Sequence, residues 1–110
     1  MPAGAQRLTE VEQLVLLAAL RLGDEAYAVP IRGVVARHAG ISLSRGSIYV
    51  ALERLEARGL VESWFSEPTA ERGGKARRLF RVCPEGVRAL RAGRRGMDRL
   101  AAGTPLERPR

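Results

Sequence analysis

The chain has 110 residues, 45% of them hydrophobic, which suits one small folded domain with a modest core. Its net charge of +7 favours a polyanionic partner, most simply nucleic acid. One histidine and one cysteine exclude a His/Cys metal site and an intramolecular disulfide, and the lone thiol fits a reducing cytoplasm. The N-terminus does not resemble a signal peptide, and the apolar run over residues 14–20 is far too short to cross a bilayer.

The first predicted helix follows an arm, residues 1–8, that we expect to be flexible. Thr9 and Glu12 have the spacing of a capping box, in which each side chain binds the backbone N–H of the other residue. The helix then runs to about Leu22, and Gly23 ends it.

The middle of this helix, residues 14–20, is apolar on every side. A domain of this size can cover one face of a helix but not all of it. We therefore predict a homodimer in which the partner subunit covers the second face. The alternative is a central core helix in a monomer. The residues assigned to the interface here are Leu14, Leu17 and Leu20.

A second helix is predicted to start near Pro30, whose missing N–H is tolerated in a first turn, and to end at Gly40. Its buried face consists of Ile31, Val34 and Val35. The only histidine, His38, is interpreted as a capping or surface residue rather than a ligand.

The third predicted helix has two different faces. Ser44 is a good N-cap, and Gly59 suits the left-handed position after the helix. One face is apolar at helical spacing, through Ile48, Ala51, Leu52 and Leu55. The opposite face is small, polar and basic, which suits a DNA groove. An ordinary amphipathic surface helix is the alternative interpretation.

Two strand-forming segments follow, at residues 61–66 and 76–82, on either side of a loop over residues 67–75 that contains a Gly-Gly pair. A helix followed by a hairpin with a basic loop predicts a winged helix. Trp64 lies within the first strand, and we interpret it as packing on the sheet rather than as a ligand-stacking residue.

The last predicted helix starts at Pro84 and runs to about residue 102, and a frayed tail follows over residues 103–110. Glycines within this helix are costly unless another helix packs closely against them. We therefore predict that it packs against the first helix of the partner subunit. The residues assigned to this contact are Leu90, Gly93, Met97 and Leu100.

Several of these motifs resemble the PadR family of bacterial transcriptional regulators. The matching runs are Gly46-Ser47-Ile48-Tyr49, Leu52-Glu53-Arg54-Leu55-Glu56, Gly59-Leu60-Val61, and Arg72-Gly73-Gly74 through Arg78-Leu79-Phe80. The resemblance implies an α+β, mostly helical fold: a winged helix-turn-helix with a two-stranded β wing plus N- and C-terminal dimerisation helices. In that scheme residues 9–82 are the DNA-binding domain and residues 83–102 the dimerisation helix. The chain departs from the family pattern at residues 26–31 and at Cys83, where the family usually has threonine.

The sequence thus predicts a sequence-specific DNA-binding regulator, a homodimeric repressor acting on an inverted-repeat operator in double-stranded DNA. The expected DNA contacts are Ser42, Ser44, Arg45, Gly46, Ser47, Tyr49, Val50, Arg54, Arg72, Gly73, Gly74, Lys75 and Arg77. The alternatives are a winged-helix protein-interaction module and a sequence-tolerant architectural DNA binder. No catalytic constellation is visible, so we expect no enzyme activity and no cofactor. Whether a small-molecule effector exists stays open.

Overall fold

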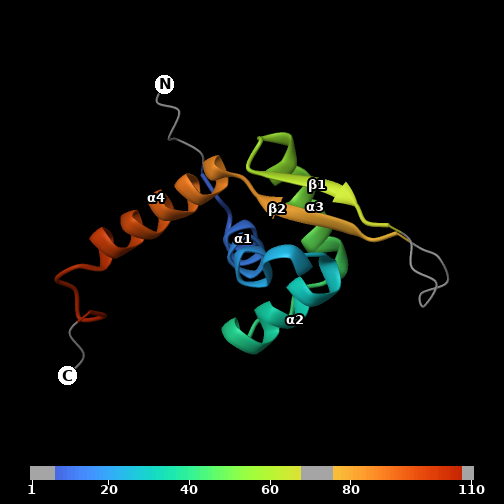
Figure 1. Cartoon of the computed structure of the whole chain (residues 1–110). Coiled ribbons are helices and arrows are strands. Elements are labelled where there is room, and N and C mark those ends of the chain that lie inside the picture. Colours follow the sequence, from blue (N-terminus) through green and yellow to red (C-terminus); the bar gives the residue numbers. More distant parts are fainter. Residues whose placement is uncertain (1–6, 68–75, 108–110) are drawn as a thin grey trace.

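The computed structural model describes residues 7–67 and 76–107, and within them it confirms the predicted winged helix-turn-helix (Figure 1). The elements in chain order are α1 (Glu10–Leu22), the short 3-10 helix η1 (Gly23–Glu25), α2 (Ala28–Ala39), α3 (Arg45–Ala57), β1 (Val61–Phe65), β2 (Arg78–Val82) and α4 (Pro84–Ala101). The first three α-helices gather beside the hairpin, whereas α4 extends away from them, on the side opposite the distal end of the hairpin (Figure 1).

The helix ends follow the local signals in the sequence. Thr9 and Glu12 form the predicted capping box at the start of α1, with backbone-to-side-chain distances of 2.9 and 3.1 Å. Gly40 adopts φ +69° at the end of α2, a left-handed conformation that favours glycine. Because these signals act within a few residues, they place the helix boundaries without reference to the rest of the fold.

The end of α3 is a Schellman motif, as predicted. Gly59 adopts φ +76°, and its N–H donates to the carbonyl of Glu56 at 3.0 Å. The N–H of Leu60 donates to the carbonyl of Leu55 at 2.9 Å, and both leucine side chains are fully buried in the core. The reversal therefore leads straight from the helix into β1.

The start of α2 differs from the prediction by two residues. The helix begins at Ala28, with Tyr27 as an N-cap that makes no side-chain capping bond, so Pro30 is the third helical residue rather than the first. The amide N–H groups of a first turn have no partner within the helix, so a proline is also tolerated at this position. The predicted buried face of Ile31, Val34 and Val35 is confirmed.

The core lies between the three α-helices and the sheet, with α1 in contact with α2, α3, α4 and β2. Its largest fully buried side chains are Leu16, Ile31, Ile48, Leu52, Leu55, Leu60 and Phe80. The two strands pair antiparallel, with Val61 opposite Val82 and Phe65 opposite Arg78. The N–H of Phe80 also donates to the carbonyl of Ala26 at 2.9 Å, which ties the sheet to the connection before α2.

The first turn of α4 is packed tightly on the end of α3. The N–H of Cys83 donates to the carbonyl of Leu60 at 2.9 Å, and Gly86 lies directly above the same carbonyl. The rest of α4 is exposed from Arg91 onward, apart from partly covered Gly96 and Ala101. At residues 103–107 the structure differs from the predicted frayed tail, because these residues form hydrogen-bonded turns, including a bond from the Thr104 hydroxyl to the Ala101 carbonyl.

Candidate nucleic-acid interface

The exposed side of α3 carries the residues that the sequence marks for DNA. Ser42 and the predicted α3 residues Ser44, Arg45, Gly46, Ser47, Tyr49, Val50 and Arg54 are all exposed. Ser44 caps the helix, accepting from the Ser47 N–H at 3.0 Å and donating its hydroxyl proton to the Ser47 oxygen at 2.9 Å. These bonds leave the Ser47 hydroxyl proton free to donate outward, near the N-terminal end of α3.

One flank of α3 is fixed to the sheet by Arg78. Its guanidinium lies 2.8 Å from a carboxylate oxygen of Glu53 and 2.8 Å from one of Glu56. The Ser63 hydroxyl donates to the other Glu56 oxygen at 2.8 Å. The hydrogen bond to Glu53, with further support from Glu56, raises the pKa of Arg78. Two successive turns of α3 are thereby held against both strands, which sets the angle between the helix and the wing.

Replacing Arg78 by alanine should therefore lower the free energy of unfolding by about 1–2 kcal/mol, because two charge-assisted hydrogen-bonded pairs are lost. Arg81→Ala is the matched control, since Arg81 pairs with Glu62 on the other face of the same strand, with both side chains more than half exposed. That control should change stability by less than about 0.5 kcal/mol. Urea denaturation measures the free energy of unfolding of both variants. An equal decrease in the two would show that the ion pairs of Arg78 do not anchor α3 more than an exposed pair does.

The opposite flank of α3 is joined to the start of α1. The carboxylate of Glu12, only 4% exposed, lies 2.9 Å from the Arg58 guanidinium. Arg58 also donates to the backbone carbonyl of Arg7 at 2.9 Å, which fixes the segment before α1 against the C-terminal end of α3. Arg58 and Arg78 thus hold the helix from opposite sides, and its polar face remains open between them.

The wing residues divide into two groups. Arg72, Gly73, Gly74 and Lys75 lie outside the described residues. Arg77 is half-buried, and its guanidinium stacks 4.5 Å from the ring centre of Tyr27, at the start of α2. Its backbone N–H donates to the Ser66 hydroxyl at 3.0 Å. The structure therefore gives Arg77 a packing role at the base of the wing.

The contacts of Trp64 and Cys83, which the sequence analysis also singled out, are with residues of the same chain. Trp64 lies on the sheet surface with the Arg81 guanidinium 5.2 Å from its ring centre. Cys83 precedes α4 without a side-chain capping bond, and burial, with nearby Glu62 and Glu85, raises the pKa of its thiol. A raised thiol pKa lowers the fraction of reactive thiolate. Within residues 7–67 and 76–107, no group of three or more His, Cys, Asp or Glu side chains could hold a metal ion.

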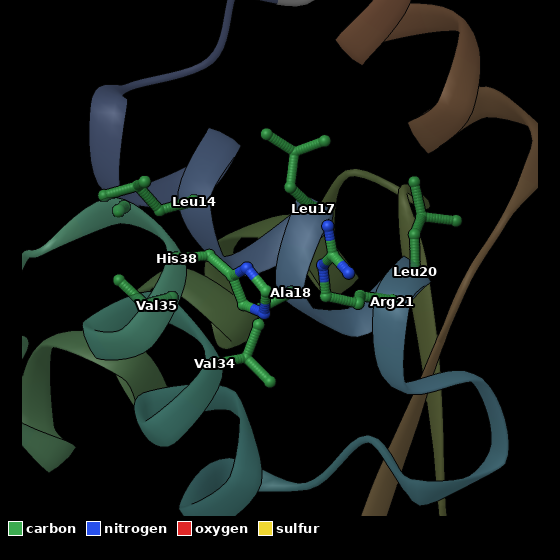
Figure 2. Close-up of a pocket in the computed structure, with 9 residues that line it drawn as sticks. Leu14, Leu17, Ala18, Leu20, Arg21, Val34, Val35 and His38 are labelled. Atoms are coloured by element: carbon green, nitrogen blue, oxygen red, sulfur yellow. The ribbon is translucent and has the colours of Figure 1, made fainter.

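A second surface, apolar rather than basic, lies between α1 and α2. A groove of about 570 Å³ is lined there by Leu14, Leu17, Leu20, Val34 and Val35. Arg21 and His38 also line it, and Figure 2 shows their side chains between these apolar residues. On α4, Met97 is 65% and Leu100 is 77% exposed, and nothing in the described chain lies near the Cβ position of Gly93. Leu90 differs from the prediction: it is 3% exposed and belongs to the core of its own chain.

Comparison with known proteins identifies the chain. Residues 16–92 match the model of the Transcriptional regulator PadR-like family. The chain belongs to the PadR-like family of transcriptional regulators. It is 36% identical over 78 residues to the transcriptional regulator Rv3488 of Mycobacterium tuberculosis, a match covering 71% of this chain and 68% of that protein.

Solved structures of related regulators have the same fold as this PadR-like protein. A transcriptional regulator from Clostridium thermocellum superposes with a TM-score of 0.70 at 22% identity, covering 83% of this chain and 85% of the other. A PadR family regulator from Eggerthella lenta superposes with a TM-score of 0.68 at 25% identity, covering 87% and 80% respectively. In the described part of the PadR-like chain, no helix is long and apolar enough to cross a membrane.

Sequence reasoning missed the two arginines that position the recognition helix of this PadR-like regulator. In the sequence, Arg78 is named only within a run that resembles the family, and Arg58 is given no role. The available signal was the location of the carboxylates, since Glu53 and Glu56 are the only acidic residues of α3 and lie one turn apart. Such a pair on an otherwise basic helix favours a cationic partner elsewhere in the fold.

Proposed function

We propose that this PadR-like regulator binds operator DNA as a homodimer and represses transcription by occupying an inverted-repeat site. The observation that carries the proposal is the exposed face of α3, which is small, polar and basic. The apolar face of the helix is buried in the core, and the helix is held at both flanks by ion pairs. A helix so held can enter a major groove in one orientation, as base reading requires.

The residues divide by the chemistry they offer. Arg45 presents a fork of donors suited to the O6 and N7 atoms of guanine, and Val50, 51% exposed, suits the methyl group of thymine. Tyr49 and Arg54 lie on the sides of the helix and suit backbone phosphates. Among the described residues, Arg45 and Arg54 take part in no ion pair. Their charge is therefore free for DNA.

Replacing Arg45 by alanine should reduce discrimination between the operator and mismatched sites by about 1–3 kcal/mol if its side chain reads a base. Titration of the operator and of single-base variants with parent and mutant proteins measures this difference. Arg32→Ala on the exposed side of α2 is the control for loss of one charge. Equal weakening on every sequence would assign Arg45 to a phosphate instead.

The homodimer is supported by the fit between two exposed apolar surfaces. The groove lined by Leu14, Leu17 and Leu20 is open on α1, while Met97 and Leu100 project from the free half of α4. A two-fold pair could place the α4 of each copy in the groove of the other, with Gly93 allowing close approach. The half-sites of an operator for such a dimer would lie about one helical turn apart.

Selection from a genomic duplex library at physiological salt, followed by titration with salt, tests the proposal. Enrichment of a short inverted repeat and a steep fall in affinity with salt are the expected results. Binding without sequence preference would favour an architectural DNA binder. Absence of duplex binding would favour a protein-interaction module. We also propose that the regulator is cytoplasmic, where its operator DNA lies. The operators found in the selection would identify the regulated genes, and these genes would guide the search for an effector.

A further inference from the structure

A groove lies on the side of α3 that faces the start of α1. Its volume is about 390 Å³, and its lining includes Thr9, Val11, Gly46, Ser47, Val50 and Arg54. Gly46, Ser47 and Val50 also belong to the proposed reading face, so the groove opens beside the surface that would meet the bases. From the sequence, the first helix is included in the DNA-binding domain, but no DNA contact is expected before Ser42.

The charge around this groove is positive. Its one carboxylate, Glu12, is buried, lies 2.9 Å from the Arg58 guanidinium and accepts the Thr9 N–H, so its charge is compensated within the protein. Arg54 is exposed at the groove. The bond from Arg58 to the Arg7 carbonyl holds the backbone of a further exposed arginine near the C-terminal end of α3, outside the lining of the groove but two residues before Thr9, which lines it. A mobile anion would therefore meet Arg54 and Arg7 without a competing free carboxylate from Glu12.

Thr9 can add a hydrogen bond. Its oxygen accepts the Glu12 N–H at 3.1 Å, and no acceptor within the described chain binds its hydroxyl proton. Ser47 is in a similar position, since its oxygen accepts from Ser44 and its own proton remains available. Two hydroxyl donors and an arginine on a concave surface suit the oxygens of a phosphate.

The two flanks of α3 meet different strands of a duplex. A helix in the major groove has one sugar-phosphate backbone on each side. The flank with Tyr49 and the wing would face one strand, and the flank with Arg54 and the start of α1 would face the other. Building on the proposed function, we infer that the α1–α3 groove binds a backbone phosphate of the second strand through Arg54, Arg7 and the Thr9 hydroxyl.

Single methylphosphonate substitutions in the operator test this contact directly, because each removes the charge of one phosphate. At one position on the second strand, the substitution should weaken binding of the parent protein while having much less effect on Arg54→Ala. Arg54→Ala and Arg7→Ala should each lower the slope of log affinity against log salt by about 0.9, the loss of one phosphate contact. Arg32→Ala, an exposed arginine of α2 away from the groove, should show the parent's methylphosphonate response at this position.

The outcomes separate the inference from the function on which it rests. If the parent binds the operator but Arg54→Ala and every methylphosphonate act additively, the α1–α3 groove does not hold a phosphate and the regulator proposal stands. If Arg7→Ala has no more effect on the salt slope than Arg32→Ala, the contact excludes the segment before α1. If the parent binds no duplex, both the groove assignment and the proposed function are wrong.

Discussion

Replacing Gly86 by alanine is expected to lower the free energy of unfolding by about 2–3 kcal/mol, the upper part of the range for overpacking a closed site. A Cβ atom at this position would lie 2.3 Å from the Leu60 carbonyl oxygen and 2.9 Å from Cγ1 of Val82. The carbonyl cannot move away cheaply, because it accepts the Cys83 N–H and follows directly on the Schellman motif. The helix α4 would have to shift as a whole, which would loosen its packing on the end of α3 and the hairpin.

Gly33→Ala is the matched control for this prediction. Gly33 lies within α2, and the only atom near its Cβ position is the flexible end of Arg37, at 3.3 Å. Alanine should therefore stabilise the protein there by up to about 1 kcal/mol, the usual gain in helix propensity. Guanidinium denaturation at one fixed protein concentration compares the two variants. A Gly86→Ala protein as stable as the parent would show that the first turn of α4 can move without cost.

The elements that sequence reasoning predicted correctly are those specified by nearby residues. The Thr9 capping box, the Ser44 cap and the glycine at position 59 each act within one helical turn, and the structure confirms all three. The start of α2 was misplaced because Tyr27 supplies no capping side chain and Pro30 is compatible with several first-turn positions. Nearby residues therefore define the end of a helix only where a capping side chain or a glycine is present.

Contacts between distant segments could not be predicted in this way. The partners Arg78 and Glu56 are separated by the hairpin turn, and Glu12 and Arg58 by two helices. Helical spacing predicts that Leu90, Met97 and Leu100 lie on one apolar face of the last helix, and in α4 they do lie on one face. Helical spacing could not show that the core of the same chain buries Leu90 in the first turns of α4, while Met97 and Leu100 in its later turns remain exposed. Periodicity identifies a buried side, not the molecule that buries it.

The exposed half of α4 leads to the second large expected effect. Leu100→Asp should convert the protein from dimer to monomer, because it would place a charge among the apolar side chains of the proposed interface. Loss of the second DNA-binding unit should weaken operator binding by about a hundredfold, the lower end of the gain from linking two sites. Leu17→Asp, on the facing helix, should have the same two effects, since the interface requires both surfaces. Sedimentation equilibrium and operator titration measure them.

Leu106→Asp is the control, because Leu106 is as exposed as Leu100 but lies in the turns after α4. It should leave both the mass in solution and the operator affinity unchanged. Circular dichroism of each variant checks that the fold is kept, as expected for substitutions at the exposed positions Leu17 and Leu100. A dimer that persists in Leu17→Asp and Leu100→Asp would require another interface. A monomeric parent that still binds the inverted repeat would mean that the two copies meet only on DNA, where the half-site spacing alone brings them together.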